Sequence, residues 1–271
     1  MYGKYYIYIY ITTISNSDGH GIYGHFCSDY IANNFPSYLN ETYTQHQHKS
    51  PKQQIPPQTL NTLITKSFVS FNTALISQKD IDSSLSGSTC VALIIFQHKL
   101  ICANLGDSRA VLSRFENGSY STLVLSRDHK PTEHDECERI KLSGGKVSPY
   151  YEEETQQYIG PNRIWFKDSG IPGLAMTRSF GDEVAHKVGV ISEPELKEVV
   201  YNGNEKFIII ASDGIWEFID CEESVHIVKE YYENDRDAKG AVRALVGEAF
   251  RRWRREEDIV DDITALVVFF E

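Results

Sequence analysis

Hydrophobic residues recur at helical spacing in several stretches of the chain. The spacing predicts helices over 59–77, 132–143, 221–232 and 238–254. In the first stretch Leu60, Ile64 and Phe68 fall on one face, which indicates a helix packed against a core. The second stretch ends at Gly144-Gly145, a pair typical of a helix C-terminus.

Short runs of β-branched and aromatic residues predict strands between these helices. The runs are Tyr5–Ile11, Thr89–Phe96, Leu100–Asn104, Arg109–Ser113, Phe207–Ala211 and Ile263–Phe270. Phe207–Ala211 is apolar at every position, so both of its faces should be buried. Strands in the middle and at both ends, with helices between them, indicate one α+β domain of packed layers over residues 1–271.

The stretch 40–58 has no such periodicity. Its sequence, NETYTQHQHKSPKQQIPPQ, is rich in Gln, His and Pro. Such a composition is typical of exposed connecting segments. We therefore predict a flexible surface loop there.

Composition narrows the classes of function. The 271 residues carry a net charge of −11, which argues against general affinity for nucleic acid. No apolar run reaches the roughly 18 residues of a membrane helix, so no membrane span is expected. The five cysteines form no Cys-x-x-Cys pair, which favours a reducing compartment, the cytoplasm or nucleus, over a disulfide framework.

Aspartates stand where several predicted strands end. Asp18, Asp107, Asp213 and Asp261 are the clearest cases. An Asp-Gly pair alone is ordinary turn chemistry, but carboxylates placed by rigid strands can converge on a cation. Oxygen ligands without cysteine favour Mg²⁺ or Mn²⁺ over Zn²⁺. His20 follows Asp18 closely, so it is a candidate general acid beside such a site; the alternative is a local hydrogen bond at a helix start.

Nine motifs, in order, resemble the metal-dependent protein serine/threonine phosphatase family, type 2C. They extend from about residue 16 to the C-terminus. They are Asp18-Gly19-His20-Gly21, Ser86-Gly87-Ser88-Thr89, Asn104-Leu105-Gly106-Asp107-Ser108-Arg109-Ala110, Asp128-His129-Lys130-Pro131, Glu138-Arg139-Ile140 with Gly144-Gly145, Leu174-Ala175-Met176-Thr177-Arg178-Ser179-Phe180-Gly181-Asp182, Ser192-Glu193-Pro194-Glu195, Ala211-Ser212-Asp213-Gly214-Ile215-Trp216-Glu217, and Asp261-Asp262-Ile263-Thr264.

The resemblance implies a four-layer sandwich, in which two antiparallel β-sheets are flanked by antiparallel α-helices. It also implies a monomer that hydrolyses phosphoserine and phosphothreonine in phosphoprotein substrates, by attack of a metal-bridging water.

Site residues follow from the same resemblance. Asp18 would bridge two Mg²⁺ or Mn²⁺ ions, and the Gly19 carbonyl would bind one of them. Asp213 and Asp261 would complete the shell of the other ion, and Asp107 with Asp213 and Glu217 would form a weaker third site. His20 would protonate the leaving oxygen, so His20 and Asp18 are the expected catalytic residues.

The chain departs from the family pattern before Asp18. Members usually carry a phosphate-gripping Arg and an acidic pair on their first strands, whereas Met1–Ser17 contains no Arg, Asp or Glu. This departure leaves an alternative open, a catalytically impaired member that acts as a regulatory binding protein. Arg109 and Arg178 are candidates for a replacement phosphate contact, although we expect each to pair with a carboxylate.

Overall fold

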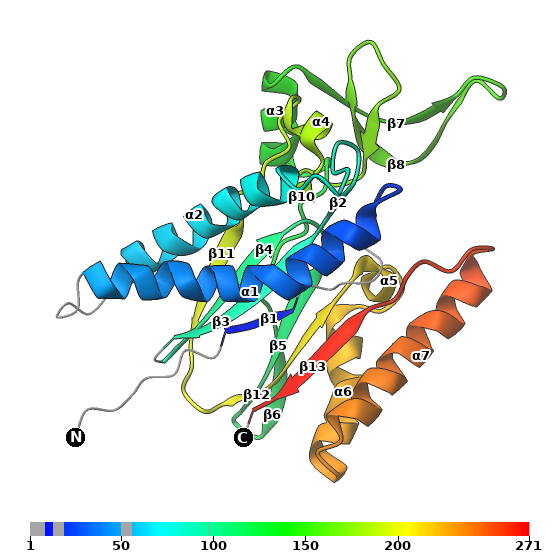
Figure 1. Ribbon diagram of the computed structural model, residues 1–271. Coiled ribbons are helices and arrows are strands. Elements are labelled where there is room, and N and C mark those ends of the chain that lie inside the picture. Colours follow the sequence, from blue (N-terminus) through cyan, green and yellow to red (C-terminus); the bar gives the residue numbers. More distant parts are fainter. Residues whose placement is uncertain (1–8, 13–18, 50–55, 97, 271) are drawn as a thin grey trace.

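Two antiparallel sheets, packed face to face, form the centre of the molecule (Figure 1). The computed structural model describes residues 9–12, 19–49, 56–96 and 98–270. The first sheet has the order β1 (Ile9–Thr12), β3 (Cys90–Phe96), β4 (Lys99–Leu105), β11 (Glu195–Val200). The second has the order β13 (Ala265–Phe269), β12 (Glu205–Ala211), β5 (Arg109–Glu116), β6 (Ser119–Val124).

Successive side chains of each strand point to opposite faces of its sheet, and this alternation divides the hydrophobic core into layers. On β3, Val91 and Leu93 point between the sheets, where they join Ile208 and Ile210 of β12. The intervening residues of β3, among them Ala92, belong to a cluster on the opposite face of the sheet. Both faces of β3 and β12 are therefore buried, which explains the unbroken apolar runs Cys90–Phe96 and Phe207–Ala211.

Helices α1 (Gly24–Lys49) and α2 (Pro57–Ile76) cover the outer face of the first sheet (Figure 1). The predicted helix 59–77 is confirmed as α2, and its apolar face is buried. Phe35 of α1 lies 4.6 Å, centroid to centroid, from the ring of Phe68 on α2. Both rings also meet Phe180. An aromatic cluster thus joins the helices to the segment that leads to the candidate site.

The prediction of a flexible loop over 40–58 was wrong for most of that range. Helix α1 continues to Lys49, and α2 begins at Pro57; residues 50–55 lie outside the described part of the chain. Tyr43 explains the continuation, because its ring packs 6.0 Å from that of Phe96 on β3. An isolated apolar contact among polar residues gives a weak periodic signal, so the hydrophobic pattern did not predict this part of the helix.

Helices α6 (Cys221–Asn234) and α7 (Ala238–Glu256) cover the second sheet. Each begins at an aspartate cap: Asp220 accepts a hydrogen bond from the Glu223 amide, and Asp237 accepts one from the Gly240 amide. Leu245 is one of the α7 residues buried against β12 and β13. The helix–sheet–sheet–helix order confirms the predicted α+β four-layer sandwich.

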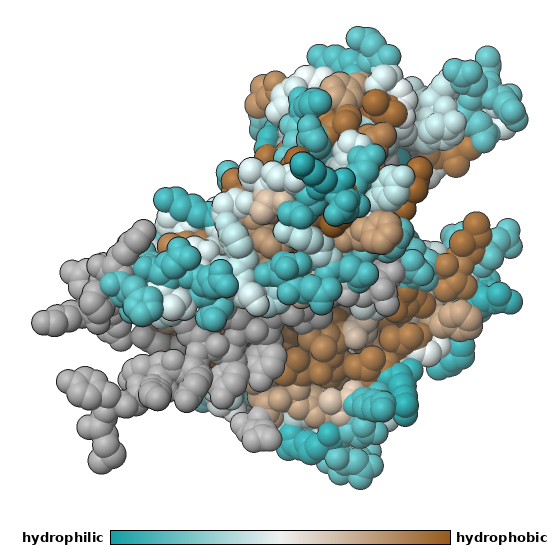
Figure 2. Space-filling view, viewed as in Figure 1, coloured by the Kyte–Doolittle hydropathy of each residue, from teal (hydrophilic) through white to brown (hydrophobic). Residues whose placement is uncertain are grey.

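A smaller region projects beyond one end of the sandwich (Figure 1). It contains α3 (His134–Leu142), β7 (Gly145–Glu152), β8 (Gln157–Phe166), β9 (Pro172–Leu174) and α4 (Glu183–His186). Sequence patterns predicted α3 but not the β7–β8 hairpin. Many hairpin side chains are exposed, Tyr158 at 61%. Figure 2 shows hydrophilic residues at the hairpin's tip and hydrophobic residues gathered along β13.

Short elements complete the fold next to the ends of the long strands. They are β2 (Gly87–Ser88), which pairs with β10 (Phe180–Gly181), and α5 (Asp213–Trp216). The predicted N-terminal strand Tyr5–Ile11 overlaps β1, and its residues before 9 lie outside the described range. No described helix is long and apolar enough to cross a membrane.

Candidate functional site

His20 lies in the segment before α1 and faces a buried carboxylate. Its Nε2 atom is 2.5 Å from Oδ2 of Asp182, whose side chain is 3% exposed. The His20 carbonyl accepts a hydrogen bond from the Gly87 amide at 3.1 Å, which ties this segment to β2. The fold therefore brings together a histidine and an aspartate that are 162 residues apart in the sequence.

Local structure holds Asp182 in place. It follows β10 with a left-handed backbone (φ 48°), and its amide donates to the Ser86 carbonyl at 2.9 Å. The Ser179 hydroxyl donates to Oδ2 at 2.5 Å. Gly87 is required opposite, because a Cβ there would lie 2.3 Å from Oδ2.

A second buried carboxylate, Asp107, lies in the turn between β4 and β5. It forms an ion pair with Lys130, whose Nζ also lies 3.8 Å from Oδ2 of Asp213. Burial alone would lower the pKa of Lys130, but the carboxylates of Asp107, Asp213 and Asp128 outweigh it, and the pKa is raised. The ammonium therefore remains charged between two acids.

Asp213 and Asp261 lie on adjacent segments. Asp213 is the first residue of α5 and is separated from the end of β12 by Ser212 alone; Asp261 precedes β13, the strand that pairs with β12. The Ser212 hydroxyl donates to the Asp262 carbonyl at 3.3 Å, which joins the two segments. Glu217 follows α5, and its side chain is exposed, as is that of Asp261.

Three of the predicted site residues, His20, Asp107 and Asp213, fall into two separate groups. His20 meets Asp182, and Asp107 meets Asp213 through Lys130. Within the part of the chain that the structure describes, no three or more His, Cys, Asp or Glu side chains form a group able to hold a metal ion. Asp18, the expected bridging ligand, lies outside the described residues.

Sequence reasoning missed the partners of His20 and Asp107. Asp182 and Lys130 both stand in quoted motifs, so their positions were visible although their contacts were not. The expectation that the two arginines pair with carboxylates is confirmed. Arg109 donates to both oxygens of Asp128, at 3.0 and 2.8 Å, and Arg178 donates to Glu136.

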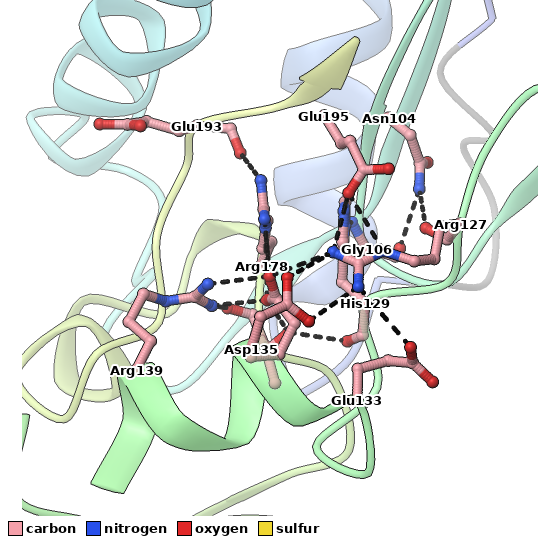
Figure 3. A network of polar contacts seen from close by, with 12 residues as sticks. Asn104, Gly106, Arg127, His129, Glu133, Asp135, Arg139, Arg178, Glu193 and Glu195 are labelled. Carbon is pink, nitrogen blue, oxygen red and sulfur yellow. Dashed lines mark hydrogen bonds and ion pairs between the residues drawn. The ribbon is translucent and has the colours of Figure 1, made fainter. Parts of the chain in front are cut away.

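Figure 3 shows a connected network of polar contacts that includes His129 and Arg178. Glu136 is fully buried and accepts hydrogen bonds from Arg139, Arg178 and the Thr177 hydroxyl. Burial would raise the pKa of Glu136, but these donors lower it well below its usual value. The carboxylate is therefore ionised and anchors the segment that leads to Asp182.

Comparison with known proteins gives a consistent result. The family model for protein phosphatase 2C matches residues 12–257. Two curated relatives from Arabidopsis thaliana are "Probable protein phosphatase 2C 35", 32% identical over 93% of this chain and 71% of the relative, and "Probable protein phosphatase 2C 34", 33% identical over 93% and 70%.

Solved structures support the fold. A serine-threonine phosphatase 2C from Toxoplasma gondii has a TM-score of 0.78 at 21% identity, with 92% of this chain and 82% of that chain covered. A sex determining protein from C. elegans has a TM-score of 0.70 at 23% identity, covering 93% and 54%. The predicted resemblance is confirmed by the family model and the curated relatives. From these matches we conclude that the chain belongs to the protein phosphatase 2C family.

Proposed function

We propose that this chain is a protein phosphatase that uses Mg²⁺ or Mn²⁺ to hydrolyse phosphoserine and phosphothreonine in protein substrates. Family membership supports the class of reaction. The observation that carries the metal dependence is the convergence of the Asp107 and Asp213 carboxylates on one cation, the ammonium of Lys130.

The position of the Lys130 ammonium supports the proposal that a cation fits between Asp107 and Asp213. Two carboxylates, one of them buried, already hold a positive charge, and no thiolate takes part. Oxygen donors of this kind suit Mg²⁺ and Mn²⁺. We propose that Asp18, the Gly19 carbonyl, Asp213 and Asp261 hold two ions. Asp107, with Asp213 and Glu217, would hold a third.

When bound, such ions lower the pKa of water and neutralise charge on a phosphate. The chain itself supplies the proton for the leaving oxygen. We propose that His20, whose Nε2 is directed at Asp182, donates this proton to the seryl or threonyl oxygen. Asp182 fixes the ring orientation and stabilises the protonated imidazole.

Charge neutralisation and positioning provide most of the catalysis in phosphoryl transfer to water. Arg109 and Arg178 are engaged with carboxylates, so neither is proposed as the phosphate grip. Lys130 is the remaining candidate, because it lies beside Asp107 and Asp213 and its charge could contact an incoming phosphate.

The test is phosphate release from a phosphothreonine peptide in Mn²⁺, in Mg²⁺ and in EDTA. We expect turnover in the metals, none in EDTA, and a loss of roughly 100-fold or more in Asp213→Asn. Asp235→Asn, at the exposed end of α6, is the control and should retain the wild-type rate. Folded wild-type protein without turnover in either metal would favour the regulatory binding protein instead.

A further inference from the structure

One buried histidine lies between the two halves of the candidate site. His129 is fully buried, and it precedes Lys130 in the loop that follows β6. Its Nδ1 accepts a hydrogen bond from the Gly106 amide at 3.0 Å, and its own amide donates to the Gly106 carbonyl at 3.0 Å. These reciprocal bonds fix the residue immediately before Asp107 (Figure 3).

The turn at Gly106 depends on this support. Gly106 has φ +107°, and a Cβ there would lie 2.5 Å from Cγ2 of Thr89. This position therefore cannot carry a side chain, and hydrogen bonds from neighbouring residues hold the turn in place. Asn104, also buried, donates from Nδ2 to the Gly106 carbonyl at 3.2 Å and to the Arg127 carbonyl at 2.8 Å. Asn104 and His129 together tie the Asp107 turn to the loop that carries Lys130.

The other side of His129 reaches the half of the site that contains Asp182. The His129 carbonyl accepts a hydrogen bond from the Thr177 amide at 2.8 Å, and the Thr177 hydroxyl, which donates to Glu136, lies 3.0 Å from it. Thr177 starts the short segment that continues through Ser179 to Asp182. One residue therefore contacts both segments, with its ring on one side and its carbonyl on the other.

We propose that His129 is a positioning residue that sets the Asp107 carboxylate for cation binding and fixes its place relative to the Asp182 segment. The proposal rests on the proposed function, because it assumes that Asp107 is a metal ligand. The ring acts as a neutral imidazole. Since Nδ1 is the acceptor, the proton resides on Nε2, which lies 3.6 Å from Oε2 of Glu195. Burial, aided by the nearby Arg178, lowers the pKa of His129 to about 3, which keeps the acceptor available.

Two matched substitutions separate the acceptor from the bulk of the ring. The side-chain oxygen of Asn falls near the position of Nδ1, whereas the amide of Gln falls near that of Nε2. His129→Asn should therefore preserve the bond from the Gly106 amide, and His129→Gln and His129→Leu should remove it. Asp107→Asn is the reference for a direct loss of the ligand.

The experiment measures Mn²⁺ binding to the full-length protein by calorimetry, without substrate, in the wild type and the four variants. We expect His129→Gln and His129→Leu to weaken the same binding step as Asp107→Asn, by about 10- to 100-fold, with His129→Asn within about threefold of wild type. Amide exchange at Gly106 should accelerate in the Gln and Leu variants only. Circular dichroism confirms that each variant is folded.

Equal affinities for Mn²⁺ in wild type, His129→Asn and His129→Gln would overturn the proposal, as would equal losses in the Asn and Gln variants. The Asn–Gln pair keeps the test decisive if His129→Leu does not fold. A wild type that binds Mn²⁺ but releases no phosphate would contradict the proposed function alone, because the binding comparison would still report on His129.

Discussion

Asp182 and Asp107 are both buried carboxylates beside one basic side chain, but their surroundings differ. Asp182 accepts hydrogen bonds from the Ser179 hydroxyl and from His20, so two neighbouring side chains hold its carboxylate in place. Asp107 pairs with Lys130, and that ammonium is shared with Asp213. An acid held by fixed donors suits the orientation of a catalytic group, whereas two acids that share one cation suit metal binding.

The largest effect should come from His20. We expect His20→Gln to lower kcat on a phosphothreonine peptide by about 10²- to 10⁴-fold, because the leaving oxygen loses its proton donor. Hydrolysis of p-nitrophenyl phosphate should fall much less, since its leaving group needs no proton. An equal loss on both substrates, measured by steady-state kinetics, would contradict the role of general acid.

Replacing Asp182 should have the next largest effect. Asp182→Asn keeps the size of the side chain and tolerates the left-handed backbone, but it removes the negative charge beside His20. A misoriented ring should lower kcat on the peptide by about 10- to 100-fold. Mn²⁺ affinity, measured by calorimetry, should be unchanged; a large loss of affinity would place Asp182 with the metal ligands.

The contribution of His129, which joins the Asp107 turn to the Asp182 segment, to the stability of the fold should depend on pH. The pKa of His129 is about 3 in the folded protein, below its ordinary value of about 6.5, so the unfolded chain binds more protons between these pH values. The contribution of His129 to the free energy of unfolding is complete above its pKa in the unfolded chain, and it is lost as the pH falls below that value. The groups that face the ring are Arg178, Glu136, Arg127, Arg139 and Glu195.

We expect His129→Asn to flatten the decline in the free energy of unfolding between pH 6 and 5 by about 1 kcal/mol. Urea denaturation at each pH measures this slope. His226→Asn is the control, because His226 is 74% exposed on α6 and should leave the slope unchanged. Identical slopes in wild type and His129→Asn would mean that the ring is protonated in the folded protein.

The smallest effect should come from Lys130. Its ammonium competes with a cation for Asp107, so Lys130→Met should reduce the Mn²⁺ concentration for half-maximal binding by roughly fivefold, the size of a coupling of about 1 kcal/mol. Lys146→Met, on the exposed edge of β7, is the control. A higher Mn²⁺ requirement in Lys130→Met would show that the lysine supports the site more than it competes.

Predictability from the sequence followed the strength of local periodicity. Helix α2 was visible because one face is apolar through its whole length, and β12 because its run Phe207–Ala211 is apolar and buried at every position. Helix α1 is the exception: it was missed over 24–39 although buried apolar residues recur every four positions from Cys27 to Leu39, and it was misread as a loop after that, where polar residues surround Tyr43. The β7–β8 hairpin was missed because its exposed positions carry Tyr158 and Ile159, which blur the alternation of inner and outer residues.

The sequence alone determined the family, the order of the main elements and the motif residues, because these depend on residues close together in the chain. The tertiary structure decided which of those residues meet. His20 reaches Asp182 across 162 residues, and Lys130 lies between Asp107 and Asp213, through the pairing of β2 with β10 and the order of strands in the second sheet. Such contacts depend on register between distant segments, which no local repeat in the chain encodes.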